Sequence, residues 1–295
     1  MDFSERSENA GLVMKEEMGG YYYTDMFSSV LYTPLFTPRN VQIPHMGIFT
    51  SKPEETDLSK FLFVGVVSKF YDFVGNAGVV DSIIQSVEAS GQPVFSRRHY
   101  MSGNLAELWF ELAIGSATNV PSLGDIYPQL SISNSYSGTG AVNIKFGINI
   151  SGQDGAYGFT FRKFNNNFGG LRKVHHAGFK STLSTVVGNY VESFGENIID
   201  MITVNFAQPV HGDMVFSLLD LLEKAGKKRR DTFSSYVSQI TENGTKPINI
   251  WQLFCALVKM SSVETLNVKK YMENLAESVL IMPVKMAEIL KQVSK

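Results

Sequence analysis

The sequence is poor in the residues that build covalent or metal-linked frameworks. It contains a single cysteine, Cys255, in 295 residues, which excludes an intramolecular disulfide and a cysteine-cluster zinc site. It has no apolar run of about 18 residues, so no helix is expected to span a membrane. The first residues lack the apolar segment of a secretory signal. These absences predict a cytoplasmic protein.

Enzyme signatures are also missing. There is no Walker loop, no G-x-G-x-x-G after a strand, no G-x-S-x-G and no H-E-x-x-H. His175 and His176 are adjacent, so on a helix they diverge by about 100° and do not readily share a metal. We therefore expect no enzymatic activity, no cofactor and no metal. Glu107 and Glu111 could form an acid–base pair in a hydrolase, but no suitable partner lies nearby, which favours a solvated sheet face.

A large net charge is absent, yet the charge is unevenly distributed. The 26 basic and 28 acidic side chains leave a net charge of −2, which excludes a protein that is basic over its whole surface. Residues 1–154 hold 16 acids and 9 bases, whereas residues 155–295 hold 12 acids and 17 bases. Such an uneven charge distribution is typical of proteins that bind an anionic partner or that self-associate through faces of opposite charge.

Two basic segments stand out in the second half. Gly155–Val191 contains five basic residues and no acid, and residues 227–230 form the run Lys-Lys-Arg-Arg. A solvated face without a partner is the alternative explanation for both, and it is stronger for the four-residue run. The longer segment also contains aromatic residues, which favours a binding site there.

The sequence predicts an α+β fold, in which an antiparallel β-meander packs against a long helix and an all-helical C-terminal region follows. Apolar content is 44%, enough for a sizeable core. A continuous apolar run at 61–71 predicts a buried strand, and the spacing at 77–89 predicts an amphipathic helix. Alternating patterns predict strands at about 104–114, 126–134, 141–150 and 156–164. Helices are expected at about 176–204, 214–225, 230–241, 248–261, 265–279 and 284–293.

The expected domain organisation has four parts. Residues 1–20 are polar and predict a flexible arm. Residues 21–57 are rich in aromatics and prolines, which forbids a long helix and indicates an extended segment lying on its own core or on a neighbouring subunit. Residues 58–208 form the α+β core domain, and residues 209–295 form the helical C-terminal domain.

The combination of cations and aromatic rings predicts a single-stranded nucleic-acid site. Cations bind phosphates, and aromatic rings stack bases at about 1–3 kcal/mol each. Phenylalanines beside a strand are as often part of the protein core as they are stacking platforms. The alternative role for Phe164 and Phe168 is therefore burial in the core. The expected DNA-binding residues are Arg97, Arg98, Lys145, Arg162, Lys163, Phe164, Phe168, Arg172, Lys173 and Lys180.

Three segments, 64–91, 124–150 and 171–179, together resemble the phage and plasmid family known as domain of unknown function 932. Its turn pattern N-S-H-D-G-S-G-A corresponds to Asn134–Ala141, where Tyr136 and Ser137 replace the histidine and aspartate. The cysteine of its C-x-N-G strand end is absent at 151–155. The resemblance covers about 60–205 and implies a phage or mobile-element origin.

The order of the predicted elements also resembles the core of phage single-strand annealing proteins of the RecT, Redβ and Erf kind. That resemblance implies rings or filaments holding single-stranded DNA in a basic groove. We therefore expect a homo-oligomer that binds and anneals single-stranded DNA in recombination or replication, without nucleotide hydrolysis. The alternative is a non-enzymatic phage structural or assembly protein, such as a virion component, suggested by the aromatic segment, the charge polarity and the helical tail.

Overall fold

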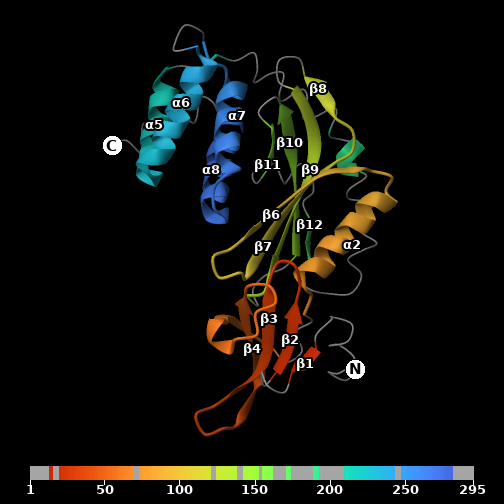
Figure 1. Ribbon diagram of the computed structural model, residues 1–295. Coiled ribbons are helices and arrows are strands. Elements are labelled where there is room, and N and C mark those ends of the chain that lie inside the picture. The colour runs from red at the N-terminus through yellow and green to blue at the C-terminus, as the bar shows by residue number, and fades with distance from the viewer. Residues whose placement is uncertain are drawn as a thin grey trace. The chain divides into compact units, whose positions relative to one another are not determined.

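In a computed structural model of the protein, two antiparallel sheets are combined with helices that follow mainly in the C-terminal part (Figure 1). The structure describes residues 13–15, 20–68, 73–120, 124–137, 142–152, 155–161, 171–173, 189–192, 194, 209–210, 212–242 and 247–281. The chain divides into two interleaved units. The first comprises Met1–Ser116, Leu130–Phe146 and Gly169–Gly188, and the second comprises the remaining segments. Strands β9 and β10 each contribute residues to both units.

The aromatic, proline-rich segment builds a sheet of its own in the first unit. It is extended, as its prolines predict, and it forms most of a five-stranded antiparallel sheet in the order β1-β2-β3-β4-β5. Pro34 lies in β3 beside a shift in register, where a missing N–H is tolerated. The strands are β1 (Val13–Lys15), β2 (Gly20–Thr24), β3 (Ser29–Phe36), β4 (Gln42–Ser51) and β5 (Leu62–Ser68), with the short 3-10 helix η2 (Leu58–Lys60) before β5.

Strand β5 is not the buried strand that its apolar run predicts. One face of the five-stranded sheet packs Val30, Ile48 and Val67 into a core with Tyr136. However, β5 is the last strand of the sheet, and its side chains at 62, 63 and 66 are about half exposed. The prediction of a buried strand was wrong because an apolar run does not reveal whether a strand has one neighbour or two.

The second sheet has seven strands, in the order β11-β10-β9-β7-β6, with β12 pairing β10 and β8 pairing β9. The four strands expected at about 104–114, 126–134, 141–150 and 156–164 correspond to β7, β9, β10 and β11. The strands are β6 (Val94–Met101), β7 (Glu107–Ile114), β8 (Thr118–Val120), β9 (Gly124–Ser135), β10 (Val142–Gly152), β11 (Gly155–Thr160) and β12 (Leu171–Lys173).

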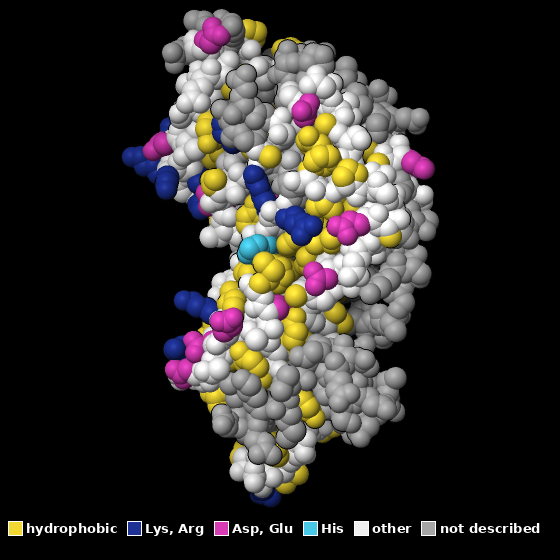
Figure 2. Space-filling model, turned by 45° about the vertical axis from the view of Figure 1, so that its right-hand side comes forward, with side chains coloured by type: hydrophobic (Ala, Val, Ile, Leu, Met, Phe, Trp, Pro, Cys, Tyr) yellow, Lys and Arg dark blue, Asp and Glu magenta, His cyan; other side chains and the backbone are white. Residues whose placement is uncertain are grey.

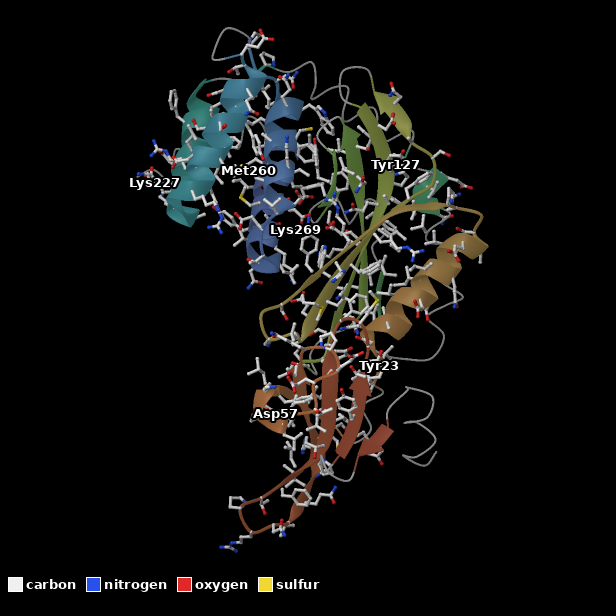
Figure 3. The ribbon with its side chains drawn as sticks, in the orientation of Figure 1. Tyr23, Asp57, Tyr127, Lys227, Met260 and Lys269 are labelled. Carbon is white, nitrogen blue, oxygen red and sulfur yellow. The ribbon has the colours of Figure 1, made fainter. Side chains whose placement is uncertain are left out.

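Helix α2 (Asn76–Ala89) begins where three segments of the first unit meet. The Asp25 carboxylate accepts hydrogen bonds from the backbone N–H of Ala77 at 2.9 Å and from the N–H groups of residues 27 and 28. The Tyr136 hydroxyl accepts from the Asn76 N–H at 2.8 Å. These acceptors come from distant segments and satisfy the first N–H groups of the helix, which have no partner within it. Figure 3 shows Tyr23, whose hydroxyl donates to Asp25, near this end of α2.

Among the described residues after 209, the second unit contains four helices, which correspond to four of the five predicted there. Helix α7 begins at a capping box in which Asn249 and Gln252 bond each other's backbone N–H groups. The helices are α5 (Gly212–Ala225), α6 (Lys227–Ile240), α7 (Ile250–Ser261) and α8 (Leu266–Ile281). Among the described residues, no helix has both the length and the apolar character needed to cross a bilayer.

The long helix expected over 176–204 lies mostly outside the described residues. Its residues 189–192 and 194 are helical, and the Tyr190 hydroxyl donates to the Gly147 carbonyl. The arrangement of a meander across a long helix therefore stays a prediction. The helix expected at 284–293 also lies outside the described residues.

A buried ion pair on α8 covers the outer edge of β11. Lys269 and Glu273 have no exposed side-chain surface and lie 2.9 Å apart. The Lys269 ammonium donates to the Gly158 carbonyl at 3.3 Å, and the Glu273 carboxylate accepts from the Thr160 N–H at 3.3 Å. Figure 3 shows Lys269 between α8 and the strands. The pair thus supplies β11 with the donor and acceptor that a further strand would have offered.

Candidate nucleic-acid interface

The seven-stranded sheet has a polar face within the first unit. In β6 and β7, Arg98 lies opposite Glu111 and Tyr100 lies opposite Trp109, so these four share a face. The backbone N–H of Tyr136 donates to the carbonyl of Ala106. In an antiparallel pair this bond places Tyr136 opposite Ala106, and therefore residues 133 and 131 of β9 opposite residues 109 and 111 of β7. Residues in opposite positions lie on the same face of the sheet.

Three of the expected basic residues lie on this face. The Asn143 amide donates to the Ser133 hydroxyl at 3.5 Å, which places Asn143 on the polar face, and Lys145 follows two residues later in β10. Arg172 of β12 lies opposite Asn143, so its register position is on the same face. Arg98, Lys145 and Arg172 therefore occupy register positions on one face of the sheet, in β6, β10 and β12.

The polar face is not an open surface. The exposed fractions of Glu111 and Trp109 are only 2% and 3%. The indole N–H of Trp109 donates to the Glu111 carboxylate at 3.1 Å. The expectation that Glu107 and Glu111 lie on a solvated face was wrong for Glu111, because β7 is an inner strand with both faces covered. The buried Glu111 lies opposite Arg98 in the register of β6 and β7.

Strand β6 presents an exposed mixture of rings and cations at the edge of the sheet. Phe95, Arg97 and His99 alternate along one side of the strand, and all three are exposed, Phe95 by 55%. The His99 ring packs edge-on against Phe27 at 5.3 Å, which holds it in place. Arg98 and Tyr100 point to the polar face. This edge of the sheet therefore combines side chains that bind phosphate with rings that stack bases.

Five of the expected DNA-binding residues lie in three described strands. Arg97 and Arg98 lie in β6, on opposite faces of that strand, and Lys145 lies half-buried in β10. Arg172 and Lys173 lie in β12, at register positions opposite Asn143 and Val142. Arg98 and Lys145 are three strand spacings apart, or about 14 Å. The other expected residues, Arg162, Lys163, Phe164, Phe168 and Lys180, lie outside the described residues.

The basic run 227–230 is divided between internal and solvent-facing roles. Arg229 contacts both carboxylate oxygens of Glu264 at 2.7 and 2.9 Å, which raises the pKa of the guanidinium. Arg230 pairs with Glu223 at 3.1 Å. Lys227 and Lys228 line a shallow hollow of about 520 Å³ on α6. Figure 3 shows Lys227 on the outer side of the helices, and Figure 2 shows basic side chains gathered on this helical part.

Two features of the structure were not predicted from sequence. Phe95 lies two residues before the Arg97–Tyr100 cluster, and only its position in an edge strand distinguishes it from a core residue. Lys269, Glu273 and Glu277 are fully buried. Their spacing of four residues indicates a common stripe on the helix, but such a stripe is normally solvated.

Two residues of the turn on which the family resemblance depends, Asn134 and Tyr136, hold the start of α2. The Asn134 amide donates to the Asn76 side chain at 2.9 Å and to the Val74 carbonyl, and Tyr136 caps α2 as described above. Burial raises the pKa of the Tyr136 hydroxyl well above its ordinary value. These residues lie in the core and bind the helix start.

Comparison with known proteins adds no family assignment. No protein-family model matches the chain, and no match was found among curated proteins or solved structures. The resemblances to the family of domain of unknown function 932 and to the annealing proteins therefore stay predictions.

Proposed function

We propose that the protein binds single-stranded DNA and promotes annealing as a homo-oligomer, in phage-type recombination or replication, without nucleotide hydrolysis. The observation that best supports this proposal is β6, which exposes Phe95, Arg97 and His99 along one edge of the sheet. Successive members of this row are about 7 Å apart along the strand.

The chemistry follows from these residue types. The Arg97 guanidinium binds phosphate through charge-assisted hydrogen bonds, and the Phe95 ring stacks a base without regard to its identity. Neutralising phosphates reduces the repulsion between two single strands, and stacking holds their bases unpaired and accessible. Annealing by this route needs no bound nucleotide and no metal.

The test is a binding titration of a fluorescently labelled oligonucleotide over a range of salt concentrations. Arg97→Ala removes one phosphate contact, so the slope of log affinity against log salt should fall by about 0.7. Phe95→Ala should weaken binding about 5- to 100-fold and leave the salt slope unchanged, because stacking carries no charge. A strand-annealing assay without nucleotide should slow in parallel.

Matched controls come from the helices of the second unit. Lys227→Ala removes one cation from α6, and Phe216→Ala removes an exposed ring from α5. Both controls should bind as the unchanged protein does. The proposal fails if the unchanged protein shows no salt-dependent affinity, or if the β6 variants and the controls bind equally well.

The second candidate is a phage structural or assembly protein. The half-exposed apolar side chains of β5 favour it, because exposed apolar patches mark interaction surfaces. A stoichiometric complex with another phage protein that forms without nucleic acid, seen by size-exclusion chromatography, would favour this candidate over DNA binding.

A further inference from the structure

Within the described residues, strand β5 is an apolar edge of the five-stranded sheet that no further strand covers. Its seven residues, Leu62–Ser68, include no charged residue and no proline. Leu62, Phe63 and Val66 are 51%, 57% and 46% exposed. An uncharged edge strand of this kind is a ready template for pairing with another strand.

Two other long edges in the described part of the chain are protected. Strand β6 carries Arg97, Arg98 and His99, and charged side chains discourage strand addition. The edge of β11 is occupied by Lys269 and Glu273 from α8. Strand β5 has neither device, so it is the exception among these three edges.

Among the described residues, the cation nearest to β5 in the sequence does not guard the strand. Lys60 lies two residues before Leu62, but its ammonium lies 3.1 Å from the Glu55 carboxylate and 3.6 Å from that of Asp57. These two acids neutralise the charge that would otherwise repel a second strand at this end.

We propose that β5 pairs antiparallel with β5 of a second copy of this chain, about a two-fold axis between Val64 and Gly65. The uncharged strand is self-complementary, because no like charges meet when it pairs with itself. The inference rests on the homo-oligomer of the proposed function, for which it names the contact, and it requires no nucleic acid.

The side-chain pattern fits this two-fold pairing. A register shift between β4 and β5 places Phe63 opposite Phe49 and Val66 opposite Gly47. Phe63 and Val66 therefore share one face of the sheet, although they are three residues apart. Pairing about Val64–Gly65 sets Phe63 opposite Val66 of the second copy, and Val66 opposite its Phe63. Aromatic and β-branched side chains in opposite positions stabilise paired strands.

The size of the surface predicts a reversible dimer. The exposed parts of Leu62, Phe63, Val66 and the neighbouring Leu58 amount to roughly 400 Å², about half of what one partner contributes to a standard interface. The strand backbones and flanking side chains add to this area. We therefore expect a dissociation constant in the micromolar range.

The test is sedimentation equilibrium of the full chain without nucleic acid, over protein concentrations from about 1 to 100 µM. The unchanged protein should shift from its monomer mass of 32.8 kDa to twice that value. Val66→Lys places a charge in the pairing edge and should raise the dissociation constant about tenfold or more. Phe63→Lys is a second variant with the same expectation. Both variants should keep the unchanged protein's circular dichroism spectrum.

The matched control is Val263→Lys, which changes an exposed valine in the second unit and should dimerise as the unchanged protein does. A monomer throughout the concentration range would overturn the inference, as would oligomers that persist in both β5 variants. A monomeric Val66→Lys variant that still binds the oligonucleotide would show that dimerisation and DNA binding succeed or fail separately.

Discussion

Lys269 and Glu273 are both completely buried, so each charge depends on the other for compensation. Removing one partner leaves an unpaired buried charge, which costs about 3–5 kcal/mol. We expect Glu273→Gln to lower the free energy of unfolding by about this amount, measured by urea denaturation. The amide keeps an acceptor for the Thr160 N–H, so the loss would come mainly from the charge.

Arg230→Met is the control for this prediction. It breaks the Arg230–Glu223 pair, whose side chains are 42% and 49% exposed, and it should change stability by less than about 1 kcal/mol. Equal effects of the two substitutions would contradict the compensating role of the buried pair.

Tyr190 makes stability fall at alkaline pH. Burial raises the pKa of its hydroxyl above the ordinary value of 10.0. The unfolded chain therefore loses this proton above pH 10, whereas the folded protein retains it. The contribution to stability is complete below pH 10 and decreases above it, by about 1.4 kcal/mol per pH unit.

The variant Tyr190→Phe should reduce the slope of unfolding free energy against pH above pH 10 by that amount. Its stability at pH 7 should also fall, since the hydrogen bond to Gly147 is lost. Urea denaturation between pH 8 and 11 measures both effects. An unchanged slope in Tyr190→Phe would contradict the role of this hydroxyl.

Among the elements, the pairing of β10 with β11 depends on a glycine. A Cβ atom on Gly147 would lie 1.9 Å from the carbonyl oxygen of Phe159 on β11, a distance that requires backbone displacement. Gly147→Ala should therefore destabilise the protein by about 2 kcal/mol or more in thermal or urea unfolding.

For Gly78→Ala we expect the opposite effect on the stability of the protein. Gly78 lies inside α2, and no atom would lie within 4 Å of an added Cβ. Alanine is the better helix former by about 1 kcal/mol, so this substitution should stabilise the protein slightly. Destabilisation by Gly78→Ala would show that α2 packs more tightly at this point than the structure indicates.

The patterns of single elements were predictable where they extend over several turns or strand residues. Alternation in 141–150 identifies β10, and the spacing in 77–89 identifies α2, within one or two residues. Strand β6 was seen only as a basic cluster, because its two faces are not separated by polarity. The prediction that β5 is buried was wrong, because burial depends on the neighbouring strands, which come from residues distant in the sequence.

At the scale of the whole molecule, the strands of the second unit depend on C-terminal helices. Phe159 packs on Phe254 of α7 at 4.9 Å, and α8 covers the edge of β11. We expect a fragment of residues 1–208 to lose hydrogen-exchange protection in β11, as measured by mass spectrometry. Protection in β3 and β4 should persist, since their sheet belongs to the first unit.

This experiment also tests the expected boundary near residue 209. Protection of β11 in the fragment, equal to that in the full chain, would show that residues 1–208 fold without the helical region. Loss of protection would show that the helical region completes the second unit.

The sequence alone determined the types of the main elements, because periodicity and turn chemistry are local properties. It also determined which side chains can bind phosphate or stack bases. Only the tertiary structure decided that Arg98, Lys145 and Arg172 share a face, that Lys269 and Glu273 are buried, and that β5 lies at an edge. These outcomes depend on strand order and register, which arise from contacts between residues far apart in the chain.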